Sequence, residues 1–170
     1  GISINDTLLD IIVNDMIQKT VEINNCACSA IISNPLSDYL KLADTYQKLK
    51  EGFHIRMIRK QQWQYIFLDE LQYDRIMLHI SEDTEVHQFI RCKLGSLVEY
   101  DRAHDTQLLE TLEALIQNHN SRKLAAESLF LHRNTMVHRI NKIEEVLHCS
   151  LDDTEIMEQL EFAIKMKMYA

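Results

Sequence analysis

The polar residues of segment 132–142 have the chemistry to bind base edges and phosphates. The segment reads His-Arg-Asn-Thr-Met-Val-His-Arg-Ile-Asn-Lys and combines hydrogen-bond donors and acceptors with positive charge. Asparagine and histidine can both donate and accept hydrogen bonds, as base edges require, whereas arginine and lysine suit phosphates. Such binding needs these side chains to lie on one face of a rigid element.

A helix over about residues 133–147 would sort the segment into two faces. At about 100° per residue, the apolar residues share one narrow sector, which we expect to face the core. They are Met136, Ile140, Ile143 and Leu147. The opposite sector holds Asn134, His138 and Asn141, with Lys142 beside them and Arg133, Thr135 and Arg139 on the flanks.

The helical projection assigns a role to each exposed residue. Asn134 and His138 are assigned to base edges, with Asn141 on the same face. Arg133 is assigned to a guanine or a phosphate. The better phosphate candidates are Thr135, Arg139 and Lys142. The first turn of such a helix adds a partial positive charge that attracts the backbone of a nucleic acid, and His132 is placed to cap it.

A short helix over residues 121–129 would complete a helix-turn-helix. Ser121 is a suitable N-cap, and Ala125 and Ala126 are small enough to let two helices cross closely. The longer second helix is the one that enters a major groove in such modules. The start of the first helix adds two further interface candidates, Arg122 and Lys123.

Charge is distributed unevenly along the chain. The whole sequence carries a net charge of -8, whereas residues 121–142 carry +4, so the remainder carries -12. A local basic surface on an acidic body still attracts DNA at that surface. The spacing alone is equally compatible with a helical hairpin whose polar face is merely solvated.

Other kinds of site find little support in the sequence. The histidines lack the i, i+4 spacing of a helical metal site, and no glycine-rich phosphate loop occurs. The four cysteines lack paired metal-ligand spacing, so we interpret them as reduced thiols, with Cys26 and Cys28 in the core. We therefore expect no catalytic residues, no metal, no cofactor and no enzyme activity.

The elements before residue 96 are expected to mix helices and strands. An amphipathic helix should run from a cap at Asn5 or Asp6 to about Glu22. The further expectations are a strand at 26–33, a helix from 37–38 that ends at Gly52, extended segments at 55–58 and 64–68, and helices at 72–80 and 84–94.

Residues 96–170 contain neither proline nor glycine, and we expect them to be entirely helical. Asp105 and Thr106 should cap a helix whose apolar stripe is Leu108, Leu109, Leu112, Leu115 and Ile116. The helices at 121–129 and about 133–147 follow. A final helix should begin at the cap 152–154, with Ile156, Leu160, Ala163 and Ile164 directed inward.

The string SLFLHRNTMVHRINKIEEVLHCSLDD, residues 128–153, resembles the C-terminal helix-turn-helix of the PucR and CdaR regulators of purine and sugar-diacid catabolism. The matching residues are His132, Arg133, Asn134, Thr135, Arg139, Ile143 and Glu144. With LGSLVEYDRAHDTQLLETLEALI upstream, the resemblance covers about residues 94–170. His138 stands where the family has tyrosine, and Arg122 and Ala125 stand where it often has an apolar residue and threonine. The resemblance implies DNA binding and leaves the base preference open.

Residues 5–68 more weakly resemble the later half of the degenerate GGDEF-like domain that precedes this module in the family. The resemblance rests on ACSAIIS and NPLSDYLKLADTYQKL; no Gly-Gly-Asp-Glu-Phe string is present, so nucleotide cyclase activity is not implied. The expected fold is mainly α, with a partial α/β region at 1–70, connecting helices at 71–95 and an all-α helix-turn-helix domain at 96–170.

These observations predict a cytoplasmic transcriptional regulator that binds double-stranded DNA as a homodimer, without membrane contact. A single helix-turn-helix reads few bases, which is why two half-sites are expected. A small-molecule effector would act through a region outside this chain. The alternative is a helical protein-interaction module that has lost DNA binding.

Overall fold

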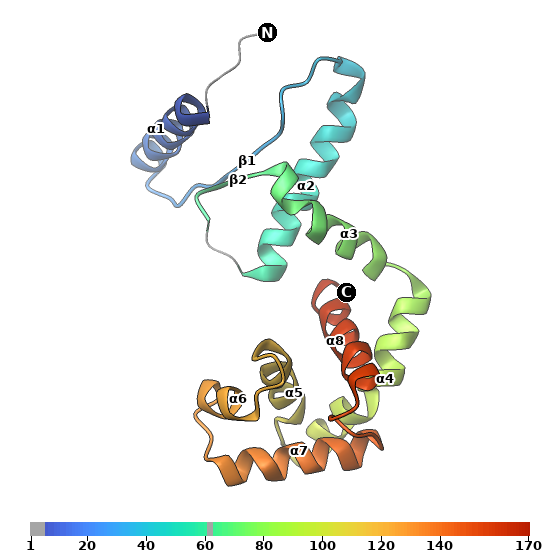
Figure 1. Cartoon of the computed structure of the whole chain (residues 1–170). Helices are drawn as coiled ribbons and strands as arrows, with labels where there is room; N and C mark the ends of the chain where they lie inside the picture. The colour runs from blue at the N-terminus through green and yellow to red at the C-terminus, as the bar shows by residue number, and fades with distance from the viewer. Residues whose placement is uncertain (1–5, 61–62) are drawn as a thin grey trace. The chain divides into compact units, whose positions relative to one another are not determined.

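The computed structural model describes residues 6–60 and 63–170, which divide into two compact units, Gly1–Met77 and Leu78–Ala170 (Figure 1). In the first unit, the elements are α1 (Asp6–Asn24), β1 (Ala30–Ile32), the 3-10 turn η1 (Tyr39–Lys41), α2 (Leu42–Arg59), β2 (Tyr65–Phe67) and η2 (Leu68–Leu71). Helix α3 (Gln72–Ser81) spans the division. The second unit contains α4 (Thr84–His104), α5 (Leu108–Gln117), α6 (Arg122–Ser128), α7 (Arg133–Leu147) and α8 (Thr154–Tyr169).

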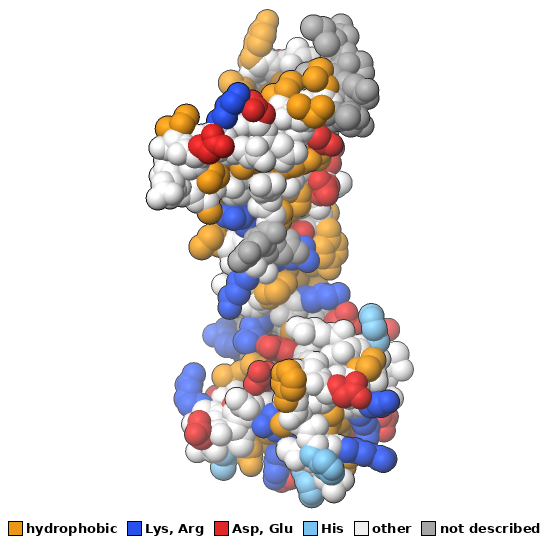
Figure 2. Space-filling model, turned by 90° about the vertical axis from the view of Figure 1, so that its left-hand side faces the viewer, with side chains coloured by type: hydrophobic (Ala, Val, Ile, Leu, Met, Phe, Trp, Pro, Cys, Tyr) orange, Lys and Arg blue, Asp and Glu red, His pale blue; other side chains and the backbone are white. Residues whose placement is uncertain are grey.

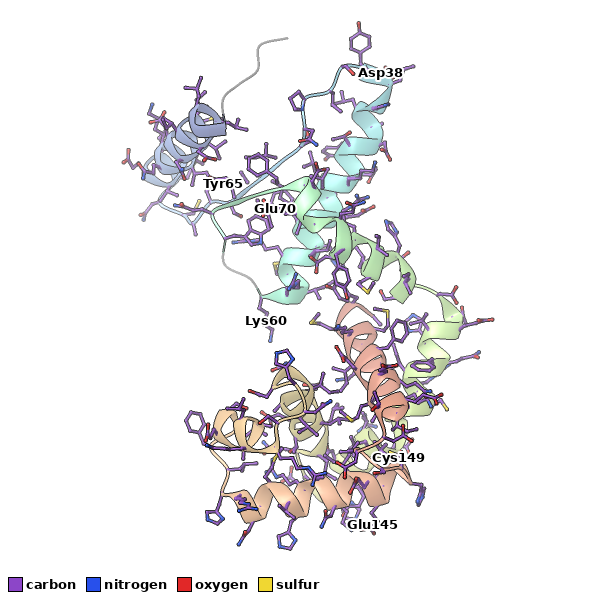
Figure 3. All side chains as sticks on the ribbon, viewed as in Figure 1. Asp38, Lys60, Tyr65, Glu70, Glu145 and Cys149 are labelled. Atoms are coloured by element: carbon purple, nitrogen blue, oxygen red, sulfur yellow. The ribbon has the colours of Figure 1, made fainter. Side chains whose placement is uncertain are left out.

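The first unit is built around a parallel pair of strands. β1 and β2 pair with Ala30 opposite Tyr65 and Ile32 opposite Phe67, and α2 makes the crossover that a parallel pair requires. Among the described residues of this unit, the buried apolar side chains are Ile17, Ile55, Leu68 and Leu71. Asp10 accepts a hydrogen bond of 2.8 Å from the hydroxyl of Tyr65, which raises the pKa of Tyr65 and ties α1 to β2 (Figure 3).

The expected end of a helix at Gly52 is wrong, as is the extended segment at 55–58, because α2 continues to Arg59. Gly52 is buried, and a Cβ atom placed there would lie 2.7 Å from Cδ1 of Ile31. Glycine therefore serves close packing of α2 against β1, and no turn is formed. Ile55, which is 1% exposed, shares the same buried face of the helix.

The other expectations for this unit hold in part. Helix α1 includes Asp6 as its first residue, so Asp6 does not precede the helix as a cap; Asn5 lies outside the described residues. The strand expected at 26–33 is confirmed only at Ala30–Ile32, and Cys26 is exposed, which corrects its assignment to the core. The extended segment at 64–68 and the helix at 72–80 correspond to β2 and α3.

The second unit is a bundle in which α4 packs against α8 and α7, and α5 packs against α6 and α7. Its core is formed by side chains from every one of these helices. They include Leu97, Leu112, Leu115, Ala125, Ala126, Met136, Ile140, Ile143, Leu160 and Ala163. Ile156 and Ile164 are partly buried against this core, as expected. Within residues 6–60 and 63–170, we find no helix whose length and hydropathy would suit a membrane crossing.

The segment between α4 and α5 differs from the sequence-based expectation. Helix α4 runs through Gly95 to His104 instead of ending near Leu94, because Leu94 and Leu97 are both buried in the core. Asp105 terminates α4 in a left-handed conformation with φ 52° and does not cap α5. The cap comes from the preceding helix, since the carboxylate of Asp101 accepts hydrogen bonds from the backbone of Leu108 and Leu109.

Candidate nucleic-acid interface

Helices α6 and α7 form a helix-turn-helix. The hydroxyl of Ser121 accepts a hydrogen bond from the backbone N–H of Leu124 and caps α6, as predicted. Ala125 and Ala126, at 0% and 5% exposure, leave room for the close approach of α6 to the helices around it. Within the turn, Phe130 adopts a left-handed conformation with φ 55° and exposes 96% of its surface.

His132 ends the turn and begins α7. Its Nδ1 atom accepts a hydrogen bond of 3.3 Å from the backbone N–H of Asn134, which confirms the predicted cap. A ring nitrogen that accepts carries no proton, so the neutral imidazole holds its proton on Nε2. The first turn of α7, residues 133–135, is exposed at the surface.

The two predicted faces of α7 are present. Met136, Ile140 and Ile143 are at most 1% exposed and pack into the core, and Leu147 is partly buried against it. The polar residues expected on the far side are exposed: Arg133, Asn134, Thr135, His138 and Asn141. In Figure 2, histidine and basic side chains are visible at the lower end of the second unit, the level at which α7 lies in Figure 1. The helix therefore offers a polar surface to a partner.

On the flank of α7 that faces α5, Arg139 is already engaged within the protein. Its guanidinium donates to Oγ1 of Thr111 at 3.1 Å and to Oε1 of Gln107 at 3.3 Å. Thr111 is fully buried, so this contact fixes the position of α7 relative to α5. A phosphate contact by Arg139 would have to share or replace these hydrogen bonds.

Lys142 lies on the same flank and is paired with Glu145. The two side chains are 2.6 Å apart, and the Lys142 ammonium also lies 5.7 Å from the centre of the Tyr100 ring. The hydrogen bond to Glu145 raises the pKa of Lys142. Glu145, labelled on α7 in Figure 3, thus places a negative charge beside the polar face of the helix.

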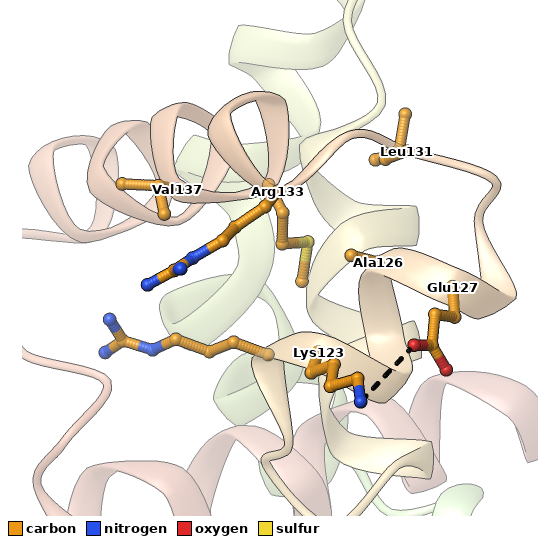
Figure 4. Close-up of a pocket in the computed structure, with 8 residues that line it drawn as sticks. Lys123, Ala126, Glu127, Leu131, Arg133 and Val137 are labelled. Carbon is orange, nitrogen blue, oxygen red and sulfur yellow. Dashed lines mark ion pairs between the residues drawn. The ribbon is translucent and has the colours of Figure 1, made fainter.

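On the opposite flank, α6 and α7 enclose a cleft of about 640 Å³ (Figure 4). Its lining comprises Arg122, Lys123, Ala126, Glu127, Leu131, Arg133, Met136 and Val137. Arg122 pairs with Asp152 at 2.7 Å, and Lys123 lies 3.9 Å from Glu127. In the part of the chain that the structure describes, the Arg133 guanidinium has neither an ion pair nor a hydrogen bond.

The comparisons with known proteins match this region. The family model for the PucR C-terminal helix-turn-helix domain matches residues 108–166, from the start of α5 into α8. Residues 108–166 form a PucR-type helix-turn-helix domain. The helix-turn-helix of α6 and α7 thus lies within the part of the chain that matches this family model.

Among curated proteins of Bacillus subtilis (strain 168), the chain is similar to three named regulators. It is 33% identical over 91 residues to the purine catabolism regulatory protein, covering 54% of this chain and 17% of that protein. It is 31% identical over 133 residues to the proline-responsive transcriptional activator PutR, covering 76% of this chain and 32% of that protein. The DNA-binding transcriptional activator AdeR is 28% identical over 74 residues, covering 44% and 18%. The chain spans under a third of these regulators' lengths, and no solved structure matches it.

Sequence reasoning missed the acids that pair with the cations of the PucR-type domain. Glu145 and Asp152 lie just outside the basic window 121–142, yet they neutralise Lys142 and Arg122 in space. Asp152 is 30 residues from Arg122, so no local pattern could have revealed that pair. The i, i+3 spacing of Lys142 and Glu145 was a usable signal.

A second missed residue is Val137, which is 39% exposed and lines the α6–α7 cleft of the PucR-type domain. It follows Arg133 by one helical turn, and both residues line the cleft drawn in Figure 4. The exposed face of α7 is therefore not wholly polar. At about 100° per residue, Val137 falls outside the sector of Met136, Ile140 and Ile143, and that position was the signal that could have found it.

Proposed function

We propose that this chain is the DNA-binding part of a PucR-type transcriptional regulator and that α7 enters the major groove of double-stranded DNA. The observation that carries the proposal is the α6–α7 helix-turn-helix, in which Asn134, His138 and Asn141 are exposed opposite a fully buried face. Modules of this kind insert the second helix with its N-terminal residues against base edges. The named relatives, which are transcriptional regulators, support the same role.

The roles proposed for individual residues follow from their positions. Asn134, His138 and Asn141 would contact base edges. The residues proposed to contact phosphates are Arg122, Lys123, Thr135, Arg139 and Lys142. Arg133 is assigned to a phosphate or a guanine. The α6–α7 cleft favours Arg133 as a primary anchor, because its guanidinium needs to break no internal contact. Arg139 would have to share or replace its hydrogen bonds to Thr111 and Gln107, and Lys142 its ion pair with Glu145.

We further propose a cytoplasmic homodimer whose two domains occupy two half-sites, as the limited reach of one helix-turn-helix suggests. Small-molecule control would come from a region outside this chain; the relatives, of which the chain covers 17% and 32%, support this proposal. We also propose that residues 1–70 derive from a degenerate GGDEF-like domain. The parallel pairing of β1 and β2, joined by α2, supports this proposal. Residues 71–95 would then connect that region to the DNA-binding domain at 96–170.

A salt titration tests DNA binding by the full chain. Fluorescence anisotropy with a duplex enriched from a randomised library should show an affinity that falls steeply with salt, since lysine and arginine displace counterions from phosphates. No binding at low salt, or binding that does not depend on salt, would refute the proposal. That result would favour a helical module that binds protein instead.

Two variants separate base reading from phosphate contact. Asn134→Ala should relax the sequence preference at one position of the selected site. Lys142→Ala should weaken binding to all duplexes similarly and lower the salt slope by about 1. Thr154→Ala, at the start of α8 and away from the α6–α7 surface, is the matched control. Equal effects of both interface variants on every sequence would overturn the assigned roles.

A further inference from the structure

Val137 lies on the flank of α7 that lines the α6–α7 cleft. By the helical projection, it falls between Arg133 and Asn141, beside the sector that holds Asn134 and His138. We propose, resting on the DNA-binding function proposed above, that Val137 reads the C5-methyl group of a thymine in the major groove. It would be a specificity-determining residue to which neither the sequence pattern nor the comparisons assign a role.

The chemistry of the groove selects the partner. Among the base edges in the major groove, adenine, guanine and cytosine present hydrogen-bonding groups, whereas thymine alone adds a methyl group. A valine side chain has no donor or acceptor, so it can gain only from contact with that methyl. Its β-branched side chain is held in essentially one rotamer within a helix, which gives a fixed surface to recognise one position.

The surroundings of Val137 place it where a base edge would lie. It lines the α6–α7 cleft together with Arg122, Lys123 and Arg133, three cations suited to a phosphate backbone. Asn141 follows it by one turn along the helix and is exposed. A DNA strand held by the cations would therefore bring its bases against Val137 and Asn141.

The exposed surface of Val137 favours this interpretation over simple packing. The core-facing neighbour Met136 is 1% exposed, whereas Val137 retains 39%. An apolar side chain left this open on the polar face of α7 gains free energy when a ligand removes it from water. The thymine methyl supplies that burial without leaving any polar group unpaired.

Deoxyuridine scanning tests the proposal. A duplex selected by the full chain from a randomised library is remade with single thymines replaced by 2′-deoxyuridine, which loses only the methyl group and still pairs with adenine. The wild-type chain should bind about three- to tenfold more weakly when one particular thymine in each half-site is replaced. The Val137→Ala chain should bind the thymine and uracil duplexes equally.

Two controls make the result specific. Thr154→Ala, at the start of α8 and away from the α6–α7 surface, should retain the preference for thymine over uracil, and Val137→Ile, which keeps the branched apolar surface, should retain it too. Circular dichroism of Val137→Ala checks that the chain is folded. The proposal is overturned if a specifically bound duplex tolerates uracil at every thymine, if it has no thymine in its constrained positions, or if Val137→Ala keeps the discrimination. Failure to bind any duplex would instead refute the proposed function itself.

Discussion

Substitution of Asp101 tests how α5 is positioned in the PucR-type domain. The Asp101 carboxylate, on α4, accepts hydrogen bonds from the backbone N–H of Leu108 at 2.8 Å and of Leu109 at 2.9 Å, and from the hydroxyl of Thr106 at 2.6 Å. It thereby satisfies the first turn of α5, whose N-cap residue, Gln107, makes no side-chain hydrogen bond to that turn. One side chain from the preceding helix thus performs the function of a local N-cap.

The two oxygens of Asp101 have different partners, which sets the size of the effect. Oδ1 accepts from Thr106 and Leu108, and Oδ2 accepts from Leu109. In Asp101→Asn, one oxygen remains and an amide N–H2 replaces the other, leaving the N–H of Leu109 without an acceptor. A net charge-assisted hydrogen bond contributes about 1.5–3 kcal/mol, and partial solvent exposure reduces this, so we expect a loss of about 1–2 kcal/mol for Asn and about 2–3 kcal/mol for Ala.

Urea denaturation of the full chain measures this loss. Far-UV circular dichroism follows the helices of both units, while Trp63, the only tryptophan in the sequence, reports on the first unit by fluorescence. The transition of the second unit is therefore the part of the dichroism change that Trp63 does not show. With a slope of about 1–2 kcal/mol per M urea, Asp101→Asn should lower the midpoint of the second unit by about 1 M. The Trp63 transition should stay in place.

Asp105→Asn is the matched control, because Asp105 is the C-cap of the helix that carries Asp101 and its left-handed backbone suits asparagine equally well. We expect it to change the free energy of unfolding by less than about 0.5 kcal/mol. If Asp101→Asn changed the free energy of unfolding no more than Asp105→Asn does, Asp101 would have no part in positioning α5.

Three further predictions concern single side chains of the second unit. Phe130→Gly should raise the free energy of unfolding by about 1 kcal/mol, because glycine adopts the left-handed backbone without strain and the exposed phenyl ring makes little packing contact. An unchanged or lower free energy of unfolding in urea denaturation would contradict this. His132→Ala should lower it by about 1 kcal/mol and His132→Ser should restore it, since serine can also cap α7. At mildly alkaline pH, Cys149 should react with iodoacetamide more slowly than exposed Cys92, because burial raises the pKa of the Cys149 thiol and lowers its thiolate fraction. Equal rates of alkylation at the two cysteines, measured by mass spectrometry, would refute this.

Helical periodicity and local capping were readable from the sequence because both depend on residues within a turn or two of each other. The buried stripe of Met136, Ile140 and Ile143 and the caps at Ser121 and His132 are of this kind. These features placed α6 and α7 near their observed bounds. The roles assigned to the exposed residues stay predictions.

Tertiary structure alone decided the contacts between residues distant in sequence. Arg139 bonds to Thr111 on α5, Arg122 pairs with Asp152, and α2 continues through Gly52 because β1 packs against it there. No local pattern encodes these partners, since each depends on how separate elements pack. The sequence by itself therefore determined which face of α7 is polar, whereas packing determined which of its cations are already paired and that Val137 remains exposed among them.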